Sequence, residues 1–142
     1  MLIENQPHVE PVLEKRPHTI VENEHSDFRL LNNVNFVWEN KRITIKSGYV
    51  WDGASIPALL RVFLSPFDVR VVAPSLLHDC LYSHPDLNSV GTYYEDDKIV
   101  RKKFTKGEAD NLFRQANKAN GMNPLLTNLA FLAVRIFGKG SF

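Results

Sequence analysis

The sequence predicts an α+β fold in which a small antiparallel sheet, at about residues 28–51, is followed by four helices. Within 28–51, apolar and polar side chains alternate with a period close to two, and short polar runs interrupt the alternation. After residue 56 the apolar positions follow helical spacing, and prolines, glycines and a capping motif mark the helix ends. We therefore expect a single domain, residues 27–142, preceded by an extended arm, residues 1–26.

The arm shows neither a helical nor a strand period. It is polar and contains three prolines and five glutamates. A segment of this composition buries little apolar surface, so by itself it is expected to be extended or disordered. Packing against its own domain or against a neighbouring subunit would order it.

The sheet is predicted from short alternating runs. They lie near residues 28–30, 34–38, 43–46 and 49–51, and the polar residues between them are expected to form turns.

The first two helices are predicted from prolines that suit a first helical turn. One begins at Pro57 and runs to about Leu64, and the other runs from Pro74 to about Ser83. Residues 84–103 are expected to form a polar loop.

The last two helices have capping signals. Thr105 and Glu108 match a capping box, and Gly121 is a suitable stop for the third helix. The fourth opens at Asn123, ends at Gly138 and is apolar nearly all round. We expect it to be buried in this domain or against a partner.

Composition excludes several classes of partner. The 142 residues are 44% apolar and 23% charged, which is ordinary for a globular domain. A net charge of +1 argues against a nucleic-acid partner, and no segment reaches the ~20 apolar residues of a membrane span. Cys80 is the only cysteine, so no intramolecular disulfide can form, and its apolar setting favours a small buried side chain over a nucleophile.

His78 and Asp79 are the first candidates for chemistry. Histidine gains and loses a proton near neutral pH and can act as a general base. Adjacent side chains point about 100° apart around a helix, so Asp79 is better placed to hold a cation than to orient His78. Asp110, on a later helix, can orient the imidazole, and Tyr82 shares the face of His78. The pattern also fits a buried histidine with satisfied hydrogen bonds beside a locally bonded aspartate.

A second cluster lies in the turn that leads from the sheet into the helix at Pro57. Gly53 allows a positive φ or a close backbone approach, and Ser55 can cap the helix. Oxygen atoms in such a turn, together with Asp52, suit a hard divalent cation, with calcium as the first choice. The alternative is a turn in which Asp52 accepts hydrogen bonds from backbone amides.

Four segments, in order along residues 28–138, carry a resemblance. They are residues 48–57, residues 77–82, residues 109–113 and the last apolar helix. Together they resemble a family of small phage and prophage proteins that is catalogued only as a domain of unknown function. The resemblance implies a viral source, synthesis in the host cytoplasm and a place in the virion, and it implies no activity.

A second resemblance concerns the helices alone. His78, Asp79 and Tyr82, followed by Asp110, are similar to the active-site helices of secreted-type phospholipases, including those in some viral capsids. There the histidine activates water, its neighbour holds calcium and an aspartate on the next helix orients the histidine, which implies these roles here. This sequence lacks the disulfides and the usual form of the glycine-rich calcium loop, and a sheet precedes its helices.

These residues leave two functions open. In the first, a phage-encoded hydrolase uses His78 as base and Asp110 as its orienting acid. A cation on Asp79 and Asp52 stabilises the oxyanion while an ester or amide of a host envelope component is cleaved. In the second, a non-catalytic virion structural or assembly protein binds other virion proteins, or copies of itself, through the arm and the last helix.

Overall fold

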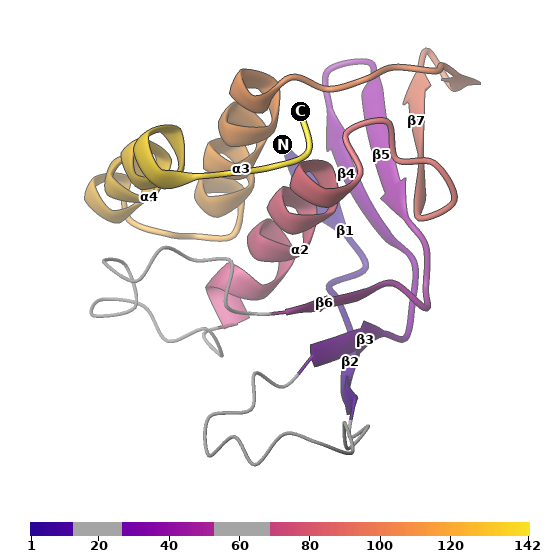
Figure 1. Cartoon of the computed structure of the whole chain (residues 1–142), viewed down its shortest axis with the longest axis horizontal. Coiled ribbons are helices and arrows are strands. Elements are labelled where there is room, and N and C mark those ends of the chain that lie inside the picture. The colour runs from indigo at the N-terminus through magenta and orange to yellow at the C-terminus, as the bar shows by residue number, and fades with distance from the viewer. Residues whose placement is uncertain (13–26, 53–68) are drawn as a thin grey trace.

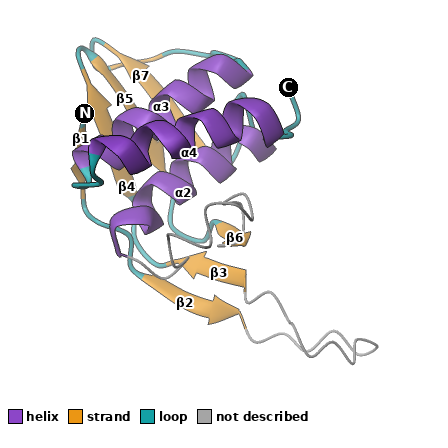
Figure 2. Cartoon of the chain, turned by 90° about the vertical axis from the view of Figure 1, so that its left-hand side faces the viewer, coloured by secondary structure: helices purple, strands orange, loops and turns teal. Residues whose placement is uncertain are grey.

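The computed structural model describes residues 1–12, 27–52 and 69–142. These residues form two antiparallel sheets and three helices, which confirms the α+β class. Figure 1 shows the helices stacked on one side of the larger sheet, with α4 outermost, and Figure 2 shows the same stack viewed from the side of α4. The smaller sheet lies at one end of the stack.

The larger sheet has five strands in the order β1-β4-β5-β7-β8, and every neighbouring pair among them is antiparallel. Its strands are β1 (Leu2–Glu4), β4 (Val34–Trp38), β5 (Lys41–Ile45), β7 (Gly91–Glu95) and β8 (Lys98–Ile99). Phe36, Ile43 and Tyr93 are in register and form a buried row across three strands. Such cross-strand rows are the units that stabilise a sheet, and this one belongs to the main core.

The smaller sheet has three strands in the order β2-β3-β6. They are β2 (Val9–Val12), β3 (Asp27–Leu30) and β6 (Val50–Asp52). The four predicted strand regions are all present, but they divide between two sheets instead of forming one. Gly48, with a φ of 94°, turns the chain after β5, so β6 pairs with β3 and not with its predecessor.

The first twelve residues, which the sequence assigns to the arm, are strands of both sheets. β1 pairs with β4 and β2 pairs with β3, where Arg29 and Glu10 form an ion pair at 2.9 Å. β1 and β2 pair where β4 and β3 present unpaired strand edges. Strands of three and four residues show too little alternation of apolar and polar side chains to be predicted from the sequence. Residues 13–26 lie outside the described residues.

The described helices are α2 (Val69–Ser83), α3 (Lys106–Ala119) and α4 (Pro124–Phe137). The predicted N-cap Thr105 is confirmed, because its Oγ1 accepts from the Glu108 amide at 3.2 Å. Asn123, where the sequence predicts the last helix to open, is also an N-cap, and its Oδ1 accepts from the Leu126 amide at 2.9 Å. α2 begins before Pro74, which lies inside it. The helix predicted at 57–64 falls outside the described residues, which therefore hold three helices and not four. None of these three helices is long and apolar enough to cross a membrane.

The predicted polar loop at 84–103 is wrong in its centre, which forms the hairpin of β7 and β8. Asp96 and Asp97 adopt positive φ in the turn, a conformation that aspartate tolerates better than most residues. β7 adds to the edge of β5, whose backbone supplies its hydrogen bonds, and of its bulky side chains only Tyr93 is fully buried. Because apolar and polar side chains hardly alternate along β7, the sequence predicts a loop there.

The sequence predicts that α4 is buried in this domain or against a partner. Within this domain it is buried on one side only, so burial of its other side against a partner stays a prediction. The side chains of Ala130, Ala133 and Val134 pack in a small cluster with Phe113 of α3. A helix that packs on one neighbour buries one face. The opposite side chains are 40–68% exposed, and they are Leu125, Leu129, Leu132, Ile136 and Phe137.

Gly91 supports a prediction about the larger sheet. A Cβ at this position would lie 2.7 Å from the backbone oxygen of Thr44 on β5, so Gly91→Ala should push the two strands apart. We expect a loss of about 2 kcal/mol in the free energy of unfolding, measured by urea denaturation. Gly107→Ala is the control, because its Cβ would meet Arg135 at an ordinary 3.6 Å. Equal stability of the two variants would contradict the prediction.

Candidate functional site

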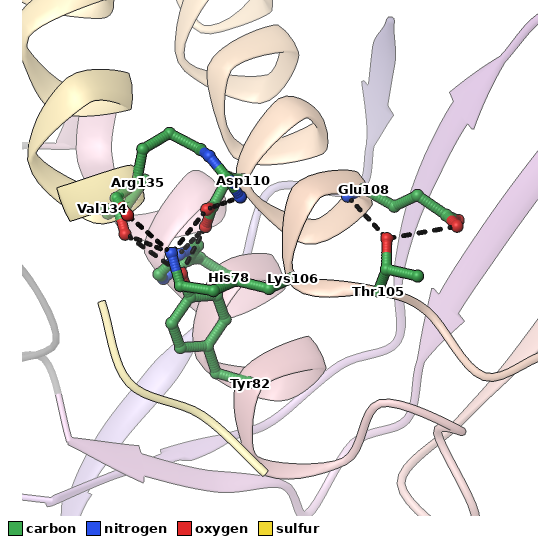
Figure 3. Close-up of polar contacts among 8 residues, drawn as sticks. All are labelled: His78, Tyr82, Thr105, Lys106, Glu108, Asp110, Val134 and Arg135. Atoms are coloured by element: carbon green, nitrogen blue, oxygen red, sulfur yellow. Dashed lines mark hydrogen bonds and ion pairs between the residues drawn. The ribbon is translucent and has the colours of Figure 1, made fainter. Parts of the chain in front are cut away.

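The Asp110 carboxylate lies at the junction of the three described helices. It is 0% exposed, and four side chains donate hydrogen bonds to it. Its Oδ1 accepts from His78 and Tyr82 of α2, and its Oδ2 accepts from the cations Lys106 of α3 and Arg135 of α4 (Figure 3). One buried side chain of α3 is therefore bonded to all three helices.

The four donors determine the charge of this carboxylate. Burial raises the pKa of Asp110, but the hydrogen bonds outweigh burial and lower it to about 2. Asp110 is therefore ionised at neutral pH and can only accept hydrogen bonds. A buried charge is tolerated when it is paired and fully hydrogen-bonded, and both conditions are met here.

His78 is oriented by this carboxylate. Its Nε2 lies 3.2 Å from Asp110 Oδ1. Because an ionised carboxylate cannot donate, Nε2 must carry the proton of this hydrogen bond. The ring is held between Tyr82 and Phe113, at centroid distances of 3.9 and 4.6 Å, and is 3% exposed. In neutral His78, Nδ1 is then the nitrogen with a lone pair for a proton.

Lys106 and Arg135 join α3 and α4 at the same point. Arg135 donates to Asp110 Oδ2 at 2.9 Å, and Lys106 donates to the same oxygen at 3.1 Å. Lys106 also donates to the backbone oxygens of Val134 and Arg135, at 2.8 and 3.0 Å. The Val134 oxygen also accepts from the Gly138 amide at 2.9 Å, so Lys106 is a further donor there, and a cation at the last turn of α4 interacts favourably with the helix dipole.

Asp79 belongs to a second contact, between α2 and the residue before β6. Tyr49 donates to Asp79 Oδ2 at 2.8 Å, and the Tyr49 ring stacks on Trp51. Burial, together with the charge of Asp79, raises the pKa of Tyr49, so its hydroxyl stays protonated as a donor. Asp79 itself is half-buried. The neighbouring Cys80 is buried, and burial raises its pKa, which agrees with the expectation of an unreactive thiol.

The structure brings three of the predicted site residues into direct contact: His78, Tyr82 and Asp110. Asp79 follows His78 on α2 and bonds to Tyr49. The backbone of Asp52 pairs with Asp27 in the smaller sheet, but its side chain, like Gly53 and Ser55, lies outside the described residues. Within the described ranges, no group of three or more His, Cys, Asp or Glu side chains is gathered that could hold a metal ion.

Sequence reasoning missed three polar contributors to these contacts. Lys106 lies four residues before Asp110 on α3, a spacing that favours an ion pair and could have revealed it. Tyr49 is buried, and its hydrogen bond to Asp79 has no local signal in the sequence. Arg135 is separated from Asp110 by a helix connection, so only the packing of α4 on α3 brings them together.

The fold and the site define a small α+β protein in which a buried histidine–aspartate pair lies where three helices meet. Residues 28–134 match the family described as Protein of unknown function (DUF1353). This match covers most of the chain, so the protein belongs to that family. Comparisons with curated proteins and with solved structures found no match. The resemblance to a domain of unknown function is thus confirmed, while the phage source and the likeness to phospholipases stay predictions.

Asp110→Asn should destabilise the fold in a pH-dependent way. The variant leaves Lys106 and Arg135 beside a neutral amide, and we expect a loss of about 3 kcal/mol at pH 7. Because the pKa of folded Asp110 is about 2, below its ordinary value of 3.8, its contribution to stability is present above pH 4. It is lost as the pH falls through about 2, so the gap between wild type and variant should close there.

Urea midpoints at pH steps from 7 to 2 measure this gap. Asp97→Asn is the matched control, because Asp97 is 93% exposed and its nearest cation, Arg42, is 3.8 Å away. It should show no gap at any pH. A gap for Asp110→Asn that persists at pH 2 would mean that the carboxylate charge is not the source of the stability.

Proposed function

We propose that the protein is a small metal-assisted hydrolase of ester or amide bonds, with His78 as general base. One observation carries the proposal: His78 is bonded through Nε2 to an ionised aspartate on a neighbouring helix, and Tyr82 donates to the same oxygen. A base held in one tautomer by a buried acid is the arrangement that activates water or a hydroxyl nucleophile.

The chemistry follows from the tautomer. His78 Nδ1 takes a proton from a water molecule as the water oxygen attacks the carbonyl carbon. The imidazolium then returns this proton to the leaving oxygen or nitrogen as the bond to the carbonyl carbon breaks. The products are an acid and an alcohol or amine. Asp110 stays ionised, holds the ring in place and stabilises the imidazolium.

A divalent cation, with calcium as the first choice, is part of the proposal. Asp79 is assigned this role because it is a half-buried carboxylate that follows His78 in sequence, and Asp52 is its proposed partner. Such an ion would supply positive charge for the oxyanion. The resemblance to phospholipase helices supports the same roles, and the resemblance to phage proteins supports a host envelope component as substrate.

His78→Gln should abolish hydrolysis. The protein is assayed with chromogenic esters of short and long acyl chains, phospholipid vesicles and peptidoglycan, each with and without calcium. We expect kcat/KM to fall at least ~100-fold in the variant, since a positioned base contributes a factor of this size. His84→Gln is the control, because His84 lies just after the end of α2 and its ring contacts Tyr49, outside the pair with Asp110.

Access to His78 is tested directly, because the ring is 3% exposed. Diethyl pyrocarbonate modifies histidine nitrogens that solvent can reach, and mass spectrometry locates the product. The hydrolase proposal needs Nδ1 of His78 to react in the folded protein. A His78 that resists modification until the protein unfolds, together with no activity on any substrate of the panel, would sink the proposal.

Asp79→Asn should weaken cation binding. Calorimetric titration with calcium, magnesium, manganese and zinc measures this, and we expect the variant to lose at least ~10-fold in affinity for the preferred ion. Asp86→Asn, at an exposed loop position, should bind like wild type. If wild type binds none of the four ions, the proposal no longer includes a cation, and the role of His78 as general base is tested without metal.

A specific observation favours a second candidate function, a non-catalytic assembly protein. Large apolar side chains on one face of α4 are exposed, and exposed apolar patches of this kind mark interaction sites. In this case the Asp110 network would serve to hold α4 in place. The binding partner would be another virion protein or a second copy of the chain.

A further inference from the structure

Four side chains form a stripe along the outer face of α4. Leu125, Leu129, Leu132 and Ile136 are 67%, 40%, 52% and 68% exposed. α4 is the outer layer of the molecule in both views (Figures 1 and 2), and its opposite face packs on α3. We call these four residues the α4 stripe.

The spacing of the α4 stripe indicates what kind of element it fits. Successive members are four, three and four residues apart. Alternating steps of three and four are the period at which one helix packs along another, each side chain fitting between those of the facing helix. A helix is therefore the occupant that matches the stripe.

The same spacing reads identically in both directions along α4. If two copies of α4 lie antiparallel about a two-fold axis, Leu129 faces Leu132 of the partner subunit and Leu125 faces Ile136 of the partner subunit. Every member of the stripe then has an apolar partner. A two-fold contact requires a surface that is complementary to itself, and this stripe meets the requirement.

Charge favours the same arrangement. Arg135 is the one charged residue of α4, and its guanidinium is bonded to Asp110 of its own chain. Antiparallel helices place the two Arg135 side chains at opposite ends of the contact, whereas parallel helices place them side by side. Antiparallel helices also align their dipoles favourably.

The exposed area is of the size that a weak dimer needs. A large apolar side chain at this exposure presents on the order of 100 Å², so the stripe with the adjacent Phe137 presents on the order of 500 Å² per copy. Two copies then bury about 1,000 Å² in total, the lower limit for a specific interface. We expect a dissociation constant on the order of 10 µM.

We propose that the α4 stripe is the interface of a homodimer in which two α4 helices pack antiparallel about a two-fold axis. This inference rests on the second candidate function, to which it assigns the partner, and it is independent of the hydrolase proposal. Hydrolysis and association are measured separately, so the failure of one leaves the other standing. If the protein is a monomer that binds another protein through α4, the assembly function holds and the homodimer proposal fails.

The first test is the concentration dependence of the mass, by sedimentation equilibrium of the full chain. Wild type should change from monomer to dimer across about 1 to 100 µM. Leu129→Glu places a charge in the centre of the stripe and should raise the dissociation constant at least ~10-fold. Asn111→Glu adds the same charge at an exposed position of α3 and should dimerise like wild type. Circular dichroism checks that both variants are folded.

The second test determines the direction of the helices. Leu125→Cys and Ile136→Cys chains are prepared separately and then mixed under a copper–phenanthroline oxidant, because in an antiparallel pair each of these positions lies about 16 Å along the axis from its own copy. Antiparallel packing predicts disulfide-linked dimers in the mixture and few in either sample alone, and buried Cys80 is the same background in all three.

Two outcomes would overturn the proposal. One is a wild-type chain that stays monomeric at about 100 µM. If it instead binds phosphatidylglycerol vesicles in a manner that Leu129→Glu abolishes, the occupant of the stripe is a lipid surface. The other is cross-linking of each cysteine variant with itself, which would show a parallel contact.

Discussion

One buried negative charge holds the helical half of this protein together. An ionised carboxylate away from water is costly unless charges and donors compensate it, and Asp110 has both. Its four donors come from α2, α3 and α4, so the three helices can satisfy it only in one relative arrangement. The apolar contact between α3 and α4 is a small cluster around Phe113 and Val134, and the polar network at Asp110 adds specificity to this packing.

The two oxygens of Asp110 contact two different groups of side chains. Oδ1 contacts the histidine and the tyrosine of α2, which are the groups with proton chemistry, while Oδ2 contacts the cations that anchor α3 and α4. The donors to one oxygen would serve a catalytic base and the donors to the other serve the fold. If both proposals hold, a reaction at His78 and a partner bound to α4 would meet at one carboxylate, through Arg135.

Local signals in the sequence predicted much of the fold. The alternation around Phe36 and Ile43 and the caps at Thr105 and Asn123 depend on neighbouring residues, and the structure has them. What local signals could not predict depends on distant partners. β1, β2 and β7 are strands because an existing edge pairs with them. His78, Tyr82 and Asp110 could be grouped from helical spacing and resemblance, whereas Arg135 and Tyr49 enter through tertiary packing alone.

The ends of the larger sheet have a consequence for how copies of this protein can meet. Its two edge strands, β1 and β8, contain three and two residues. An exposed strand edge has unpaired backbone groups with which a strand of another chain can form hydrogen bonds. A very short edge strand has too few of these groups to bind another strand stably. Growth of the sheet from molecule to molecule is thereby suppressed at both ends. A larger sheet closed in this way can lie beside a helix that exposes apolar side chains without becoming a template for fibres.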